Sequence, residues 1–352
     1  MNVTLISSEF AENKGGIPRY SYNTYKSLKN KINIKRIELT KVGNLRRLPI
    51  IRDIAVRHIY FELHKSTIKN KNVHLLAPFL LPKYLSLPKK KIVTVHDFYI
   101  FDKNYLKNIY YGEKSIYKRI FLSNLRKLNL IDLRGAYKNL DGYDHILVIN
   151  KHLKEKLING GINEDKISIS LDIIPPKFHH MVGLKNDTRT VIGYINSFPS
   201  NKLIKLKSFI EIFKKIKDPT LEFRIYGSNF PLIDLIKNDT RIKYYGFLPE
   251  NKIVKTYNTF DVYLSTSTIE GFGLPIIQAK ACKIPVLCFD GDLPEISKRN
   301  TVVWNENNIE SIITNRKWKN LSVEKAYNDT LECSEEKVTV KLLGVYKKIF
   351  EN

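Results

Sequence analysis

The sequence predicts an α/β protein built from two Rossmann-like, doubly wound domains that face an interdomain cleft. Three observations support this prediction. Short runs rich in Val, Ile and Leu alternate with helical patterns, as in parallel α/β units. A proline-broken polar stretch, DIIPPKFHHMVGLKNDTRT, interrupts the alternation, which then starts again. The length of 352 residues also exceeds that of one typical hydrophobic core.

The strand-like runs define the domain boundaries. In the first series they cover 2–7, 32–39, 72–77, 91–97, 145–150 and 166–171, and in the second series 190–195, 221–227, 241–247, 261–266 and 284–289. We therefore predict an N-terminal domain at 1–175, a linker at 176–189, a C-terminal domain at 190–333, and a helix at 334–352 that packs back toward the N-terminal domain. Open parallel sheets bind ligands at the carboxyl ends of their strands, so we expect the site in the cleft.

The composition excludes several classes of protein. With 43% hydrophobic and 27% charged residues, the chain is typical of globular rather than disordered proteins. No apolar run approaches the ~18 to 20 residues of a membrane span, and MNVTLISS lacks the charged start of a signal peptide. The three cysteines have neither a disulfide pattern nor metal-ligand spacing. These features predict a cytoplasmic protein without a metal site.

The net charge of +24 is concentrated in the first half of the chain. Residues 1–180 contain 33 basic and 15 acidic side chains, and residues 181–352 contain 26 and 20. Such a field indicates an anionic partner, although a lysine-rich, solvated surface explains it equally well. No nucleic-acid motif is present, so we expect no nucleic-acid partner.

One helical pattern in the basic half is amphipathic. Its basic residues fall on a single arc opposite an apolar one, and they are Arg119, Arg126, Lys127 and Arg134. The pattern fits an ordinary surface helix, and it also fits peripheral contact with an anionic membrane on its inner face.

Two turns after predicted strands of the first domain carry candidate ligand contacts. Gly15 and Gly16 allow close approach of a ligand to the backbone at the start of a helix, or they serve chain reversal alone. His96 and Asp97 stand where the strand predicted at 91–97 ends. His96 is placed to hydrogen-bond a substrate hydroxyl or phosphate, and the alternative is that the pair caps the next helix.

The stretch TSTIEGFGLPIIQAKACKIPVL, residues 266–287, carries the main candidate site. Glu270 precedes a tight Gly271-Phe272-Gly273 turn, Leu274 and a proline then begin a helix, and Gln278 lies on that helix. Backbone N–H groups at Gly273 and Leu274 are placed to bind an anion, with Glu270 and Gln278 binding hydroxyl groups.

This stretch resembles the donor-site motif of retaining glycosyltransferases of glycosyltransferase family 4, which have the GT-B fold. The family pattern is E-G-F-G-L-P-x-x-E followed by a helix and a G-x-P-V strand. The resemblance covers most of the chain, because GGIPRY, TVHD, ILVINKHLKEKL, YYGFLPENKIVKTYNTFDVYLS and GDLPEIS are also similar to family segments.

The resemblance implies a set of roles. A nucleotide-diphosphate sugar lies mainly on the C-terminal domain, where Glu270 holds hydroxyls of the transferred sugar. Residues Gly271, Phe272, Gly273 and Leu274 contact the sugar and diphosphate, Gln278 faces the ribose, and Lys202 binds the diphosphate. His96 and the Gly15-Gly16 loop complete the site from the acceptor-side domain. The implied reaction is metal-independent transfer of a hexose, from GDP-mannose or a UDP-hexose, to a glycan, lipid or other acceptor with retention.

The chain departs from the family pattern at two positions. Gln278 replaces the second glutamate, and the arginine often found after the first strand of the second domain is absent from IGYINS, which offers Tyr194 and Asn196. A neutral amide forms weaker hydrogen bonds than a carboxylate. The alternative function is therefore a non-catalytic sugar-nucleotide-binding or assembly subunit.

Overall fold

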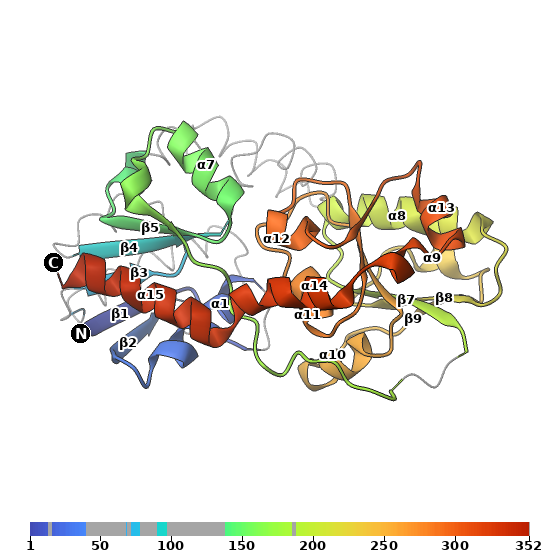
Figure 1. Cartoon of the computed structure of the whole chain (residues 1–352), viewed down its shortest axis with the longest axis horizontal. Coiled ribbons are helices and arrows are strands. Elements are labelled where there is room, and N and C mark those ends of the chain that lie inside the picture. The colour runs from blue at the N-terminus through green and yellow to red at the C-terminus, as the bar shows by residue number, and fades with distance from the viewer. Residues whose placement is uncertain are drawn as a thin grey trace, which may run out of the picture. The chain divides into compact units, whose positions relative to one another are not determined.

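The computed structural model describes residues 1–12, 16–39, 68, 72–77, 90–96, 138–184 and 188–351 (Figure 1). These residues form two compact units. The first contains the described residues up to 96, residues 138–173 and residues 335–351, and the second contains the described residues from 174 to 334. The domain boundaries and the linker at 176–189 stay predictions.

The first unit is built on a parallel sheet. Its strands are β1 (Asn2–Ser7), β2 (Asn33–Glu38), β3 (Asn72–Leu75), β4 (Lys90–Val95), β5 (His145–Val148) and β6 (Ile167–Ile169), in the order β2-β1-β3-β4-β5-β6. The order reverses between β1 and β3. All four residues of β5, three of them apolar, are buried, as expected for an inner strand covered on both faces, whereas β2 is mostly exposed at the sheet edge.

The second unit has its own parallel sheet. Its strands are β7 (Thr190–Ile195), β8 (Leu221–Tyr226), β9 (Ile242–Tyr244), β10 (Val262–Ser265), β11 (Val286–Phe289) and β12 (Val302–Trp304), in the order β12-β11-β10-β7-β8-β9. The chain runs outward from β7 to β9 and returns to the other side of β7 at β10. The reversal therefore lies between β7 and β10, and ligands bind at such a point in doubly wound sheets.

Helices connect the strands of each sheet. In the first unit they are α1 (Ile17–Leu28), α7 (Lys151–Asn159), a 3₁₀ turn at Glu164–Lys166 and α15 (Glu335–Phe350). In the second unit they are α8 (Ser200–Lys215), α9 (Ile233–Ile236), α10 (Glu250–Tyr257), α11 (Leu274–Ala281), α12 (Glu295–Lys298), α13 (Ile309–Thr314) and α14 (Val323–Thr330), with 3₁₀ turns at Lys317–Asn320 and Leu331–Cys333.

Side-chain alternation along β10 explains how the second sheet is covered. Val262 and Leu264 face a core shared with α8 and α13, whereas Tyr263 points to the other face and contacts Tyr257 of α10. Figure 1 shows α8 and α13 on one side of this sheet and α10 on the other. Both faces of the sheet are therefore covered, so a ligand can reach the sheet only at the ends of its strands.

The last helix of the chain completes the first core. Leu342, Tyr346 and Phe350 of α15 pack with buried residues of β1, α1 and β4. The Tyr346 hydroxyl also forms a 2.6 Å hydrogen bond with Nδ1 of His74 on β3. The C-terminal segment therefore contributes both apolar and polar contacts to the unit that contains the N-terminus.

The structure confirms the predicted α/β class with two parallel sheets, and each predicted strand corresponds to one of β1–β11. Among the described residues, β12 is the strand that the sequence reading missed. It has three residues and ends on the fully buried Trp304, whose Nε1–H donates a 3.0 Å hydrogen bond to the carbonyl of Ser265. This short strand supports the end of β10, where the candidate site begins.

Candidate active site of the second unit

The two predicted charged residues of the second unit meet where the order of its strands reverses. Lys202 lies in the first turn of α8, which follows β7, and Glu270 lies in the loop after β10. The Nζ atom of Lys202 is 2.6 Å from Oε1 of Glu270. Because β7 and β10 are neighbours in the sheet, residues 68 positions apart come together at its carboxyl edge.

Neighbouring polar groups fix both members of this pair. Oε1 of Glu270 also accepts a 2.8 Å hydrogen bond from the Ser267 hydroxyl, and Lys202 Nζ donates a 2.9 Å hydrogen bond to Oδ1 of Asn196. Lys202 is 8% exposed and the Glu270 side chain 17% exposed. Within the described part of the chain, no hydrogen bond uses Oε2 of Glu270. That oxygen and the third N–H of the ammonium are thus left for a ligand.

The turn after Glu270 requires glycine at position 273. Gly273 adopts the left-handed conformation (φ 80°, ψ 43°) as the N-cap of α11, and a Cβ there would lie 2.6 Å from the Ser297 hydroxyl. That hydroxyl donates a 2.6 Å hydrogen bond to the Phe272 carbonyl. Any other residue at 273 would be strained and would disturb this contact. The Phe272 ring is buried, so Phe272 offers a ligand mainly its backbone.

The loop after β11 holds the backbone of Glu270. The N–H of Glu270 donates to the carbonyl of Asp292, and the N–H of Asp292 donates to the carbonyl of Thr268. Gly291 permits this close approach, because a Cβ there would lie 2.5 Å from the Thr268 carbonyl oxygen. Glu270 is therefore positioned by two loops that enter the site from adjacent strands.

Gln278 is placed differently from the two charged residues. It is 4% exposed, and Oε1 of its amide accepts a long 3.4 Å hydrogen bond from the Tyr257 hydroxyl. Its Nε2 has no hydrogen-bond partner among the described residues. A buried amide nitrogen without a partner is uncommon. In the described structure no hydrogen bond joins Gln278 to Glu270 or Lys202, and its role toward a ribose stays a prediction.

The candidate residues of the first unit lie at the carboxyl edge of its own sheet. Gly16 is the N-cap of α1 with φ 64°, while Gly15 and Asp97 fall outside the described residues. Nε2 of His96 is 2.8 Å from the Leu76 carbonyl, which can only accept, so Nε2 carries the proton. Burial lowers the pKa of His96 to about 4. His96 is therefore neutral at pH 7, with Nδ1 as its hydrogen-bond acceptor.

Sequence reasoning missed a buried polar cluster at the same edge. The Tyr20 ring lies edge-on to His96, with centroids 4.5 Å apart, and its hydroxyl is 3.2 Å from that of Thr94. Asp172, after β6, is 5% exposed, and its Oδ1 has no partner among the described residues. Burial raises the pKa of Asp172 to about 7. Its position directly after the strand predicted at 166–171 was the signal available in the sequence.

Three further predictions from the sequence concern a basic helix face, membrane spans and metal binding. The arc of Arg119, Arg126, Lys127 and Arg134 lies outside the described residues. Among the helices that the structure describes, none has the length and apolar character needed to cross a bilayer. No group of three or more His, Cys, Asp or Glu among those residues is arranged to hold a metal ion, and the expectation of metal-independent chemistry stays a prediction.

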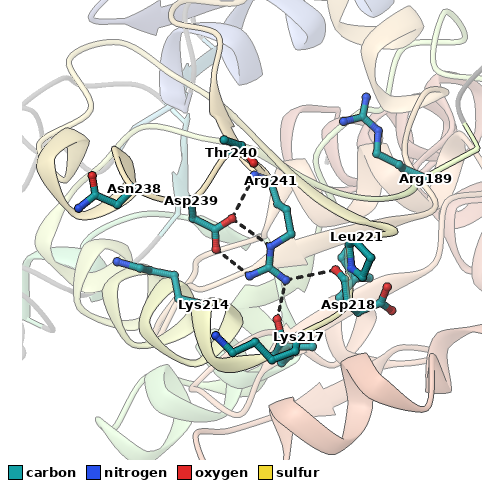
Figure 2. Close-up of a pocket in the computed structure, with 11 residues that line it drawn as sticks. Arg189, Lys214, Lys217, Asp218, Leu221, Asn238, Asp239, Thr240 and Arg241 are labelled. Carbon is teal, nitrogen blue, oxygen red and sulfur yellow. Dashed lines mark hydrogen bonds and ion pairs between the residues drawn. The ribbon is translucent and has the colours of Figure 1, made fainter.

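A surface pocket of about 660 Å³ lies at the opposite end of the second sheet, beside the starts of β8 and β9 (Figure 2). Figure 2 shows Arg241 at its centre, paired through two hydrogen bonds with Asp239. The same guanidinium donates to the carbonyls of Ile216 and Asp218 at the end of α8. The hydrogen bonds that Arg241 donates to Asp239 lower the pKa of that carboxyl group. The amino ends of parallel strands are not where such sheets bind ligands, so we assign this pocket to stability.

Replacing Arg241 by alanine should lower the free energy of unfolding by about 2 to 3 kcal/mol, because several charge-assisted hydrogen bonds are lost and Asp239 is left without its cation. For Arg241→Lys we expect a smaller loss of unfolding free energy than for Arg241→Ala, since lysine keeps the charge but not the planar fork of donors. Chemical denaturation measures both changes. A loss below about 0.5 kcal/mol, the range of ordinary surface substitutions, would contradict the structural assignment.

A family model matches part of the chain. Residues 177–315 match the model of glycosyl transferases group 1. The matched region lies within the second unit. It contains Lys202, Glu270, Asn196 and Gln278, and so includes the whole candidate site of the second unit.

Individual proteins resemble the chain over different lengths. A segment of 127 residues, 33% of this chain, is 27% identical to the O-antigen chain mannosyltransferase B of Escherichia coli and spans only 33% of that relative. Among solved structures, sucrose-phosphate synthase from Thermosynechococcus elongatus covers 99% of both chains with a TM-score of 0.73 at 14% identity. Anabaena HepE in complex with UDP-glucose covers 99% of this chain and all of its own, with a TM-score of 0.66 at 12% identity.

These similarities establish the fold class across the whole chain. At 12% and 14% identity the structural likeness concerns the fold alone. The predicted GT-B fold, with two Rossmann-like units, is confirmed. Membership in glycosyltransferase family 4 and the stereochemistry of transfer stay predictions.

Proposed function

We propose that the chain is a glycosyltransferase that moves a hexose from a nucleotide-diphosphate sugar to a glycan, lipid or other acceptor, with retention at the anomeric carbon. The observation that carries the proposal is the Lys202–Glu270 pair at the strand reversal of the second sheet, within the region that matches the model of glycosyl transferases group 1. One cation and one carboxylate at a single site match a ligand that presents both phosphate charge and sugar hydroxyls.

In this proposal the protein stabilises the leaving diphosphate with fixed donors. The free N–H of Lys202 and the first backbone N–H groups of α11, at Gly273 and Leu274, bind phosphate oxygens. The N-terminus of a helix carries unpaired N–H groups and a partial positive charge that favour an anion. Donors already aimed at developing charge lower the barrier to departure of the nucleoside diphosphate. No metal is required in this scheme.

The transferred sugar is held by acceptor groups. Oε2 of Glu270 accepts a hydrogen bond from a sugar hydroxyl, while Lys202 and Ser267 keep Oε1 in place. His96 of the first unit accepts a hydrogen bond from a substrate hydroxyl through Nδ1, which is available because Nε2 donates to Leu76. Gln278 is proposed to face the ribose.

The donor is proposed to be GDP-mannose or a UDP-hexose. The relative from Escherichia coli is named a mannosyltransferase, and the solved structure of HepE is a complex with UDP-glucose. GDP-mannose and UDP-glucose are therefore the first donors to be tested. The proposed acceptor is a glycan or lipid-linked glycan. Location in the cytoplasm, with peripheral contact to an anionic membrane, is part of the same proposal.

A panel of nucleotide sugars tests the function. The full chain is incubated with GDP-mannose, UDP-glucose, UDP-galactose and UDP-N-acetylglucosamine in EDTA, and release of nucleoside diphosphate is measured. We expect slow hydrolysis of one donor, because water replaces the acceptor. If no donor is consumed and none raises the melting temperature, the proposal fails.

A second candidate is a non-catalytic sugar-nucleotide-binding subunit. The neutral Gln278 in place of a glutamate favours it, because this chain offers one carboxylate fewer for the ligand than the family pattern. Stabilisation by a nucleotide sugar without any turnover, tested with glycan and lipid-linked acceptors, would support this candidate over the enzyme.

A further inference from the structure

Asn196 is the first residue after β7, where the family pattern often has an arginine. Its Oδ1 accepts a 2.9 Å hydrogen bond from Lys202 Nζ and a 3.0 Å hydrogen bond from the N–H of Ser197. The amide oxygen therefore faces the ammonium of Lys202.

The backbone before Asn196 is held by β10. Tyr263 of β10 is fully buried, and its hydroxyl donates a 3.2 Å hydrogen bond to the Ile195 carbonyl. This bond fixes the residue directly before Asn196. Contacts thus run from β10 to the backbone at Ile195, and from Oδ1 of Asn196 to Lys202.

This arrangement determines which proton of Lys202 a ligand meets. An ammonium group has three N–H donors, of which one is directed at Asn196, while Glu270 forms an ion pair with the same group at 2.6 Å. Asn196 is neutral, so it orients the ammonium without cancelling its charge. A carboxylate at 196 would hold the ammonium equally well and would also repel an approaching phosphate.

We propose that Asn196 is a positioning residue, which directs the remaining N–H of Lys202 at a phosphate oxygen of the nucleotide sugar and must be neutral to do so. This inference rests on the proposed function. In place of the arginine often found in the family, this chain has a neutral hydrogen-bond acceptor. This acceptor orients the single lysine toward the ligand.

Two substitutions separate orientation from charge. Asn196→Ala removes the acceptor, and we expect the dissociation constants of UDP and GDP, measured by calorimetry, to rise about tenfold. Asn196→Asp keeps the shape and the acceptor but adds a negative charge, and at pH 8 we expect a larger rise. The Lys202 ammonium beside the introduced carboxyl group lowers its pKa, so residue 196 stays ionised, and the larger rise should be confined to ligands that carry phosphates.

Ligands without phosphate separate the effect of charge from a structural effect. Uridine and guanosine have the base and ribose of UDP and GDP but carry no negative charge. We expect the ratio of the Asn196→Asp to the wild-type dissociation constant to be larger for the nucleoside diphosphate than for the nucleoside. A merely structural role of Asn196 would give the same ratio for both ligands.

Control variants keep the two hypotheses apart. Asn238→Ala, an exposed amide at the opposite end of the sheet, should bind as wild type, and thermal melts verify folding. If wild type binds neither UDP nor GDP, or if Lys202→Ala binds as tightly as wild type, the proposed function fails. If Lys202→Ala binds weakly while both Asn196 variants stay within twofold of wild type, the Asn196 inference alone is overturned.

Discussion

Replacing Glu270 by glutamine should lower the rate of sugar transfer by about 10²- to 10³-fold, while the fold and the affinity for nucleoside diphosphate are retained. Glutamine keeps the shape of the side chain but removes the charge that Oε2 offers to the sugar. Loss of one such preorganised interaction costs about 3 to 4 kcal/mol in the transition state. Lys202 no longer shares its charge with residue 270, so nucleoside diphosphate affinity should stay the same or increase.

A second ion pair on the same helix provides the control. Lys205 of α8 pairs with Glu306 at 2.5 Å, so Glu306→Gln also removes one carboxylate from a lysine of α8, but outside the proposed ligand contacts. Single-turnover transfer from a labelled donor measures all three proteins. Wild-type rates in a folded Glu270→Gln variant, or equal losses in both variants, would contradict the role of Glu270.

Lys202→Ala should raise the dissociation constant of the nucleoside diphosphate by about 10- to 150-fold, corresponding to about 1.5 to 3 kcal/mol for a charged hydrogen bond. The substitution removes a donor and also leaves Glu270 without its cation beside the phosphates. The double variant Lys202→Ala/Glu270→Gln should therefore bind more tightly than Lys202→Ala alone. Such coupling is expected between side chains in direct contact.

Calorimetric titration of Lys202→Ala, the double variant and Lys205→Ala measures these effects. Lys205 is a matched control, because it is a lysine of the same helix that forms an ion pair of similar length. We expect Lys205→Ala to bind as wild type. A double variant that binds no more tightly than Lys202→Ala would mean that the two side chains do not act on the same ligand.

The sequence was sufficient to predict the sheets but not every strand. Parallel strands buried on both faces leave continuous apolar runs, such as VYL in β10 and VLCF in β11. The missed β12 has three residues, and its assignment depends on Trp304 packing against Phe209 and Phe289. A run that short has no periodicity of its own, so tertiary packing decides its structure.

The sequence predicted the main residues of the candidate site but not all of their contacts. Glu270 and Lys202 were found from a glycine turn and a family resemblance, whereas their direct pairing depends on β7 and β10 being neighbours. The roles of Asn196 and Ser267 depend on the same adjacency. Gln278 was expected to bind a ligand hydroxyl, which stays a prediction, and the contact of its buried amide with Tyr257 was not predicted. Local sequence specifies the α11 helix, and the packing of α10 against it determines the surroundings of its side chains.

Titration of the purified chain with UDP and with GDP, in EDTA and at two salt concentrations, tests the central claim most directly. We predict that one of the two nucleotides binds at a single site without a divalent ion, and that Lys202→Ala weakens this binding at least tenfold. At 100 times its dissociation constant the ligand should stabilise the fold by about 2.7 kcal/mol. Absence of binding by either nucleotide, or binding unaffected by Lys202→Ala, would contradict the assignment of this site to a nucleotide sugar.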